Sequence, residues 1–172
     1  MLYLRDPLVD ELPHHGLEFM ARGQDTTWET GTQNHEAIAG WNGFFDYLDE
    51  CARVMKVAGW RDVFAGFAAH EHDLSVRMLD SLRGLGADVY GPPGPFARTP
   101  TVSFNVGALP ARQVAEHLAA QDVAVSDGHY YAYGLMMRTL GLEGRGGAVR
   151  ASAVHYTSSD DVDALIDALR AL

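Results

Sequence analysis

The segment Gly31-Thr32-Gln33-Asn34 places a glycine and two side-chain oxygens directly before a long stretch with helical periodicity. Thr32 or Asn34 can cap the first free N–H groups of a helix that begins there, and Gly31 lets the chain turn without a Cβ clash. Free N–H groups at a helix start, beside a threonine hydroxyl, also suit a phosphate group. The segment therefore predicts either a capped helix start alone or an anion-binding helix start.

The histidines and the cysteine do not predict a metal site or a disulfide. His70 and His72 lie on a predicted helix, where a spacing of two residues is roughly 200° around the axis, so they cannot share a ligand. Cys51 is the only cysteine, which excludes an internal disulfide and a thiolate zinc cluster. It lies among apolar residues of a predicted helix, which favours packing over reactivity.

Composition excludes several other classes of function. The chain has 172 residues, 47% of them hydrophobic, and a formal net charge of -10 with no basic stripe, so nucleic acid is not an expected partner. No apolar run approaches the ~20 residues of a membrane span, and no signal-peptide pattern opens the chain. We expect a cytoplasmic protein that does not associate with membranes.

Apolar periodicity predicts a strand at residues 1–4, a short helix over 8–12 and two long helices. The first long helix starts at Asn34 and carries an apolar stripe that includes Ile38, Trp41 and Phe45, and Gly59 ends it; the second covers residues 61–83. The second half of the chain predicts four strands and two helices, with the helices on one face of the sheet. The strands are expected at 87–90, 101–106, 123–125 and 148–155, and the helices at 111–120 and after Ser158 or Ser159 with Asp161 as part of the cap.

Several segments, in order along the chain, resemble motifs of the class V aminotransferases. These are fold-type I pyridoxal-phosphate enzymes that include cysteine desulfurases and isopenicillin N epimerases. The matching segments cover essentially the whole chain: Glu29-Thr30-Gly31-Thr32-Gln33-Asn34-His35-Glu36 (E-x-G-T-x-N), His70-Glu71 with Leu74, Arg98 to Phe104, Asp127-Gly128-His129-Tyr130-Tyr131-Ala132 (G-H-x-C-A), Val149-Arg150-Ala151-Ser152 (V-R-x-S) and His155-Tyr156-Thr157 (Y-N-T). The resemblance is to the cysteine desulfurase-like subgroup.

The resemblance implies an α/β fold, with residues 87–172 as the small α+β domain of such an enzyme. Residues 34–86 are then a long interdomain helix and a second helix, and residues 1–33 a remnant of the large domain with the Gly-Thr loop. Met1 to Arg5 resembles the strand that follows the lysine forming the aldimine with the cofactor. The only lysine here, Lys56, does not match that position. The chain therefore looks like the C-terminal half of the enzyme.

Three groups of site residues are implied by the resemblance. Thr32, with Gly31, resembles the threonine that reaches the cofactor phosphate of the opposite subunit in family dimers. Arg150 resembles the arginine that clamps the substrate α-carboxylate; the alternative is a surface ion pair. His129, Tyr130 and Tyr131 would line the substrate side, and ordinary packing is the alternative for the two tyrosines.

Tyr131 stands where the desulfurase motif has its persulfide cysteine, so sulfur relay through this chain is not expected. C–S cleavage without persulfide capture, epimerisation and elimination stay open. The sequence supports one subunit of a split enzyme for an amino-acid substrate, with pyridoxal 5'-phosphate shared and its lysine supplied by a partner chain. The alternatives are a non-catalytic remnant that binds or regulates a partner protein, and a fragment of a longer chain.

Overall fold

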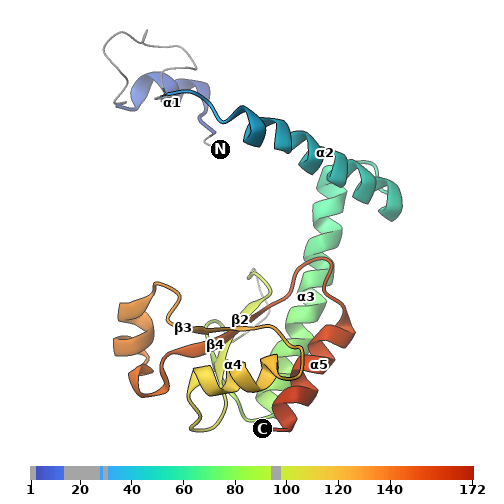
Figure 1. Cartoon of the computed structure of the whole chain (residues 1–172). Coiled ribbons are helices and arrows are strands. Elements are labelled where there is room, and N and C mark those ends of the chain that lie inside the picture. Colours follow the sequence, from blue (N-terminus) through green and yellow to red (C-terminus); the bar gives the residue numbers. More distant parts are fainter. Residues whose placement is uncertain (1–2, 14–27, 29–30, 94–97) are drawn as a thin grey trace. The chain divides into compact units, whose positions relative to one another are not determined.

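The computed structural model of the chain describes residues 3–13, 28, 31–93 and 98–172. The chain divides into two units, Met1–Val54 and Met55–Leu172, which are described separately. Figure 1 shows the elements of both units along the chain.

The first unit is helical in its described part. Helix α1 spans Asp6–Glu11, with Pro7 in its first turn, and helix α2 spans His35–Met55. Residues 3–5 form no strand, contrary to the prediction for residues 1–4, and residues 1 and 2 lie outside the described part. A strand needs a neighbour for its backbone N–H and C=O groups, so an apolar start alone does not make one.

Helix α2 begins as its sequence predicts. The Asn34 side-chain oxygen accepts a hydrogen bond from the Ala37 backbone N–H at 2.9 Å, so Asn34 is the capping residue. Trp41, Phe44 and Phe45 contact one another, with ring centroids 5.4 to 6.0 Å apart, yet all three are exposed. The helix ends at Met55, before the expected Gly59, because Lys56 adopts a positive φ of 56°.

The second unit is a four-stranded antiparallel sheet with three helices packed against one face (Figure 1). The strand order is β1-β2-β4-β3. Its elements are α3 (Trp60–Gly84), β1 (Asp88–Tyr90), β2 (Thr101–Asn105), α4 (Ala111–Ala119), β3 (Ser126–Gly128), the π-helical turn η2 (Gly134–Thr139), the 3-10 turn η3 (Glu143–Arg145), β4 (Ala148–Ser152) and α5 (Ser159–Arg170).

Alternation along the two central strands explains why the helices cover one face and leave the other uncovered, apart from a small cluster in which Met136 and Leu142 pack on Ala148. Val102 and Phe104 of β2, and Val149 and Ala151 of β4, are buried against α3, α4 and α5. Their neighbours in the sequence must therefore point to the opposite face. Helix α5 is held at its start by the predicted capping box between Ser158 and Asp161.

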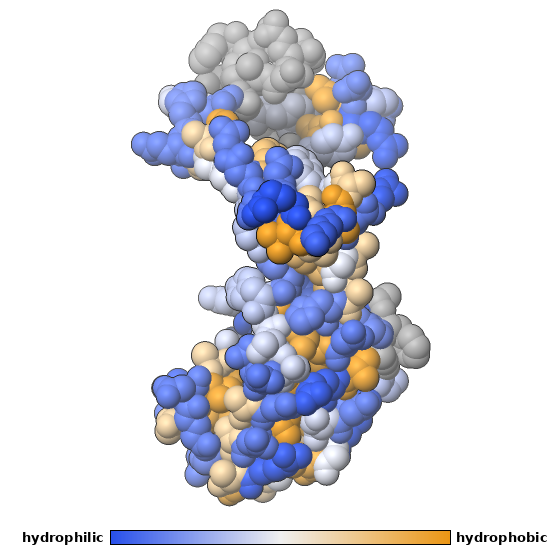
Figure 2. All heavy atoms as spheres, turned by 90° about the vertical axis from the view of Figure 1, so that its right-hand side faces the viewer, coloured by the Kyte–Doolittle hydropathy of each residue, from blue (hydrophilic) through white to orange (hydrophobic). Residues whose placement is uncertain are grey.

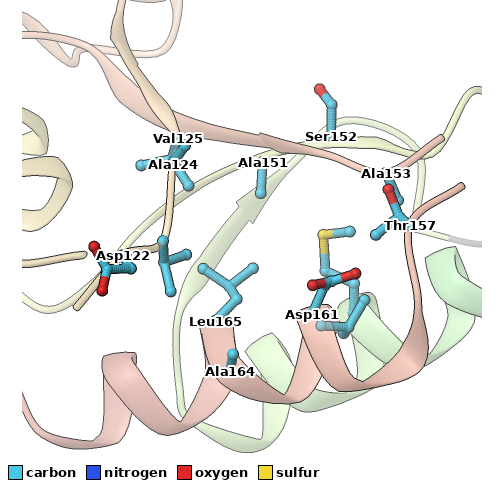
Figure 3. Close-up of a pocket in the computed structure, with 13 residues that line it drawn as sticks. Asp122, Ala124, Val125, Ala151, Ser152, Ala153, Thr157, Asp161, Ala164 and Leu165 are labelled. Carbon is cyan, nitrogen blue, oxygen red and sulfur yellow. The ribbon is translucent and has the colours of Figure 1, made fainter. Parts of the chain in front are cut away.

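The prediction of a strand over residues 123–125 is wrong, because the paired residues are Ser126–Gly128. Val123 and Val125 are only partly buried and pack on the core without joining the ladder. Here the 123–125 segment and the end of β4 line, together with α5, an open pocket of about 180 Å³ (Figure 3). An alternating apolar pattern shows only that one face of a segment is buried. Side-chain packing buries a face as well as strand pairing does, so the pattern alone does not prove a strand.

Candidate active site

Arg150 lies on the face of the sheet opposite to the helices. It is flanked in β4 by the buried residues Val149 and Ala151, and it pairs with Ser103 of β2 and Ser126 of β3. Both cross-strand neighbours have short side chains, so they leave space for the long arginine above the sheet. The register of β4 therefore presents a guanidinium group on the uncovered face.

The aromatic ring of Tyr130 lies next to this guanidinium group. The Arg150 Cζ atom is 4.4 Å from the ring centroid, which is a cation–π contact. The single hydroxyl proton of Tyr130 is shared between two carbonyl oxygens, that of Ser126, 3.0 Å from the hydroxyl oxygen, and that of Ala148. Burial raises the pKa of Tyr130 to about 12, while the charge of Arg150 acts in the opposite direction. The phenol is therefore neutral at physiological pH and leaves the arginine charge uncompensated.

Arg150 forms no ion pair with any acid in the described part of the chain. The acids of neighbouring elements are engaged elsewhere. Asp127 of β3 lies 3.8 Å from the Arg112 guanidinium, and Asp88 of β1 pairs with Arg145 at 2.8 Å. Within the described part of the chain, the Arg150 fork remains available to an external carboxylate.

His129 and Tyr131 flank Tyr130 but differ in their surroundings. The Nδ1 atom of His129 is buried and has no hydrogen-bond partner among the described residues, and its ring makes an edge contact with Tyr133. A buried ring nitrogen without a protein partner needs a water molecule or a ligand. Tyr131 is fully exposed, so its side chain packs against neither Arg150 nor Tyr130.

Gly128 and Gly147 allow the backbone at the two ends of the loop that carries these side chains to come close together. The sequence analysis did not identify these two glycines as part of the site. A Cβ at Gly147 would lie 2.2 Å from the Gly128 carbonyl oxygen and 2.4 Å from its carbonyl carbon. The two backbones can therefore approach only because Gly147 has no side chain. The signal in the sequence was the pair Gly146-Gly147 directly before β4.

Thr32 and Gly31 belong to the first unit, and the site around Arg150 belongs to the second. Thr32 is exposed two residues before the Asn34 cap, so it is not the capping residue. A Cβ at Gly31 would meet no atom within 4 Å, which means that a side chain would fit there. Thr32 is therefore an exposed residue three positions before the first residue of α2, and its expected role toward a phosphate stays a prediction.

Two kinds of feature are absent from the described residues. No group of three or more histidine, cysteine, aspartate or glutamate side chains there is placed to hold a metal ion. None of the described helices has the length and apolar character needed to cross a membrane.

Comparison with known proteins gives a consistent result. The model of the family named aminotransferase class-V matches residues 13–165. A probable cysteine desulfurase of Pseudomonas putida is 32% identical over 94% of this chain and 35% of its own length, and a cysteine desulfurase of Haloferax volcanii is 32% identical over 99% and 39%. The apo structure of a cysteine desulfurase from Thermococcus onnurineus superimposes with a TM-score of 0.78 at 26% identity, covering 98% of this chain and 41% of that one.

The 172 residues thus span well under half the length of these relatives. The likeness extends through both the helical first unit and the sheet of the second, since the match covers nearly the whole chain. The fold is that of cysteine desulfurase-like pyridoxal-phosphate enzymes, and the chain belongs to the class V aminotransferase family.

Proposed function

We propose that this chain supplies the carboxylate-binding side of a cytoplasmic pyridoxal-phosphate enzyme that acts on an amino acid. The observation that carries the proposal is Arg150, a guanidinium group without an acidic partner among the described residues. It lies on the uncovered sheet face, against the Tyr130 ring, in a V-R-x-S segment. Its planar fork can donate two parallel hydrogen bonds to the α-carboxylate of a substrate.

The residues of the chain fit part of what the cofactor needs. The exposed Thr32 hydroxyl and the positive end of the α2 helix dipole suit its phosphate group, and the orphaned Nδ1 of His129 suits a polar ligand on the substrate side. Pyridoxal phosphate, when bound, supplies an electron sink for negative charge at the substrate Cα. In this proposal Thr32 and Gly31 hold the phosphate, Arg150 binds the substrate carboxylate, His129 and Tyr131 lie on the substrate side, and Tyr130 lies against the arginine.

The lysine that holds the cofactor covalently comes, in this proposal, from a partner chain. Lys56 is the only lysine here, and it lies in the turn before α3. The sheet packs on the other end of that helix, around Leu74 and Leu82. Leu74 lies 14 residues beyond Trp60, which is about 21 Å along α3 at 1.5 Å per residue, so the sheet that carries Arg150 packs well away from Lys56, and this supports a lysine of separate origin.

The reaction proposed is C–S cleavage or a related pyridoxal-phosphate reaction without capture of sulfur on this chain. Tyr131 occupies the place of the persulfide cysteine in the G-H-x-C-A motif. Cys51 lies on α2, in the first unit, and is a partly buried free thiol. Neither Tyr131 nor Cys51 therefore places a thiol on the loop beside Arg150. A sulfur product would leave without forming a persulfide there.

A non-catalytic role is the second candidate, and the exposed apolar side chains of α2 favour it. Trp41, Phe44 and Phe45 form a cluster that a partner protein could cover. In that case the chain would bind or regulate another protein, and neither Arg150 nor Thr32 would be needed for ligand binding.

The test combines the chain with a candidate polypeptide that carries the missing lysine, in co-expression, followed by an absorbance scan for bound cofactor. L-alanine is then titrated into the complex, and its dissociation constant is read from the change in cofactor absorbance. Arg150→Ala should weaken binding by about 2–5 kcal/mol, and Arg150→Lys by less, with cofactor content unchanged in both. Thr32→Ala should instead loosen the cofactor.

Arg170→Ala is the matched control, because Arg170 is exposed on α5 and pairs with Asp167. This variant should bind L-alanine as the wild type does. An unchanged L-alanine affinity in Arg150→Ala would refute the proposed role of the arginine and favour the non-catalytic candidate.

A further inference from the structure

We propose that Tyr130 is a positioning residue for Arg150, and that it sets the preference of the site for ligands that carry a carboxylate. This inference rests on the proposed function, since it takes Arg150 as the carboxylate-binding group. It assigns Tyr130 a role exerted through the arginine and not through direct contact with the substrate.

The first argument is the geometry of the contact. With Cζ 4.4 Å from the ring centroid, the Tyr130 ring covers the guanidinium group from one side. The five N–H donors of arginine lie in the plane of the guanidinium group, so contact with a ring leaves them free to donate. Arg150 has no ion pair with a described acid, and the ring is therefore the contact that restricts its long side chain. A restricted arginine loses less conformational entropy when it binds a ligand.

The second argument is that Tyr130 is fixed to the strands that carry and flank Arg150. Its hydroxyl lies within hydrogen-bond distance of the carbonyl oxygens of Ser126 and Ala148, which share its one proton. Ser126 is the β3 residue that pairs with Arg150, and Ala148 precedes Arg150 by two residues in β4. Because Tyr130 is bonded to the same ladder, its ring and the arginine keep a defined relative position.

The third argument is the backbone of the turn. Tyr130 and Tyr131 have φ values of +49° and +61°, which are unfavourable for two consecutive aromatic residues. Tyr131 is fully exposed and gains no packing in return. Tyr130 is the residue that packs, against the small cluster of Met136, Leu142 and Ala148. The turn is thus maintained by contacts that direct the Tyr130 ring to the uncovered face of the sheet.

The inference can be tested on the chain itself by NMR. A ring beside Arg150 should shift the arginine side-chain proton resonances upfield. Tyr130→Leu should remove the shift and Tyr130→Phe, which keeps the ring, should retain most of it. Tyr133→Leu is the matched control, because it makes the same change in the same loop, where the ring lies 5.8 Å from Arg138 instead. Arg150 resonances without a ring shift in the wild type would overturn the inference.

The functional test uses the cofactor-loaded complex and two probes, L-alanine and ethylamine, which lacks the carboxylate. Tyr130→Leu should weaken L-alanine at least tenfold and leave ethylamine affinity unchanged, while Tyr130→Phe should fall between Tyr130→Leu and the wild type. Arg170→Ala, on the exposed face of α5, should match the wild type for both probes. Circular dichroism confirms that each variant keeps its secondary structure.

Each other outcome has a defined meaning. Equal weakening of both probes by Tyr130→Leu would overturn the positioning role, because a general structural defect does not distinguish a carboxylate. Unchanged L-alanine affinity in Tyr130→Leu, together with a loss in Arg150→Ala, would overturn this inference and leave the proposed function intact. Unchanged affinity in Arg150→Ala would instead overturn the proposed function.

Discussion

Replacing Gly147 by alanine should destabilise the second unit and displace the loop beside Arg150. The added Cβ would lie 2.2 Å from the Gly128 carbonyl oxygen and 2.9 Å from its Cα, so a rigid backbone must move. Overpacking of this kind costs about 1–3 kcal/mol. The φ of +105° at Gly147 adds a conformational cost of about 1–2 kcal/mol for a residue with a side chain. We expect Gly147→Ala to lower the free energy of unfolding by roughly 2–5 kcal/mol in all.

Urea denaturation followed by circular dichroism measures this loss. Gly144→Ala is the control, because a Cβ there meets no atom within 4 Å and Gly144 has no positive φ. That variant should stay within about 0.5 kcal/mol of the wild type. A Gly147→Ala variant as stable as Gly144→Ala would refute the reasoning, because β3 and β4 would then separate there without cost.

Three further predictions concern titration, covalent chemistry and association. Because burial raises the pKa of Tyr130 to about 12, the folded chain holds this proton above pH 10, where the unfolded chain releases it. The stabilisation is present below pH 10 and lost as the pH rises through 12, and the tyrosinate absorbance of the wild type should show a late step that Tyr130→Phe lacks. Borohydride reduction of the folded chain with pyridoxal phosphate should leave Lys56 unmodified by mass spectrometry; a reduced adduct would contradict the need for another lysine. Figure 2 shows apolar side chains at the surface between charged ones, and α2 exposes Ile38, Trp41 and Phe45. Because such apolar surface is normally covered, the isolated chain should self-associate. A stable monomer at micromolar concentration in sedimentation would contradict this.

The helices and most of the sheet could be predicted because their burial follows a simple period. Leu74, Met78 and Leu82 recur at helical spacing and are buried in α3. The strand over residues 123–125 was misplaced because Val123 and Val125 are partly buried without pairing. The π-helical turn over residues 134–139 was missed because its π-type hydrogen bonding leaves no clear periodic signal in so short a segment.

The candidate site was predicted as a set of residue types, but not as an arrangement. The resemblance named Arg150 and Tyr130 separately, and their contact depends on a turn with two positive φ values. Aromatic residues rarely adopt such a conformation, so no local pattern in the sequence indicates it. The roles of Thr32 and Gly31 stay predictions, because they concern a phosphate bound together with another polypeptide.

Buried and outward-facing side chains alternate along β4, so the segment between Gly147 and Arg150 cannot change in length without exchanging the two faces. Val149 and Ala151 face the core, and Arg150 between them faces outward. Inserting or deleting one residue between Gly147 and Arg150 would exchange these faces for every residue beyond the change. The arginine would then enter the apolar core as an uncompensated charge, and a valine or alanine would take its place outside. Natural relatives should therefore differ here by substitution and keep the spacing between the glycine and the arginine, whereas the loop over residues 131–146 can vary in length.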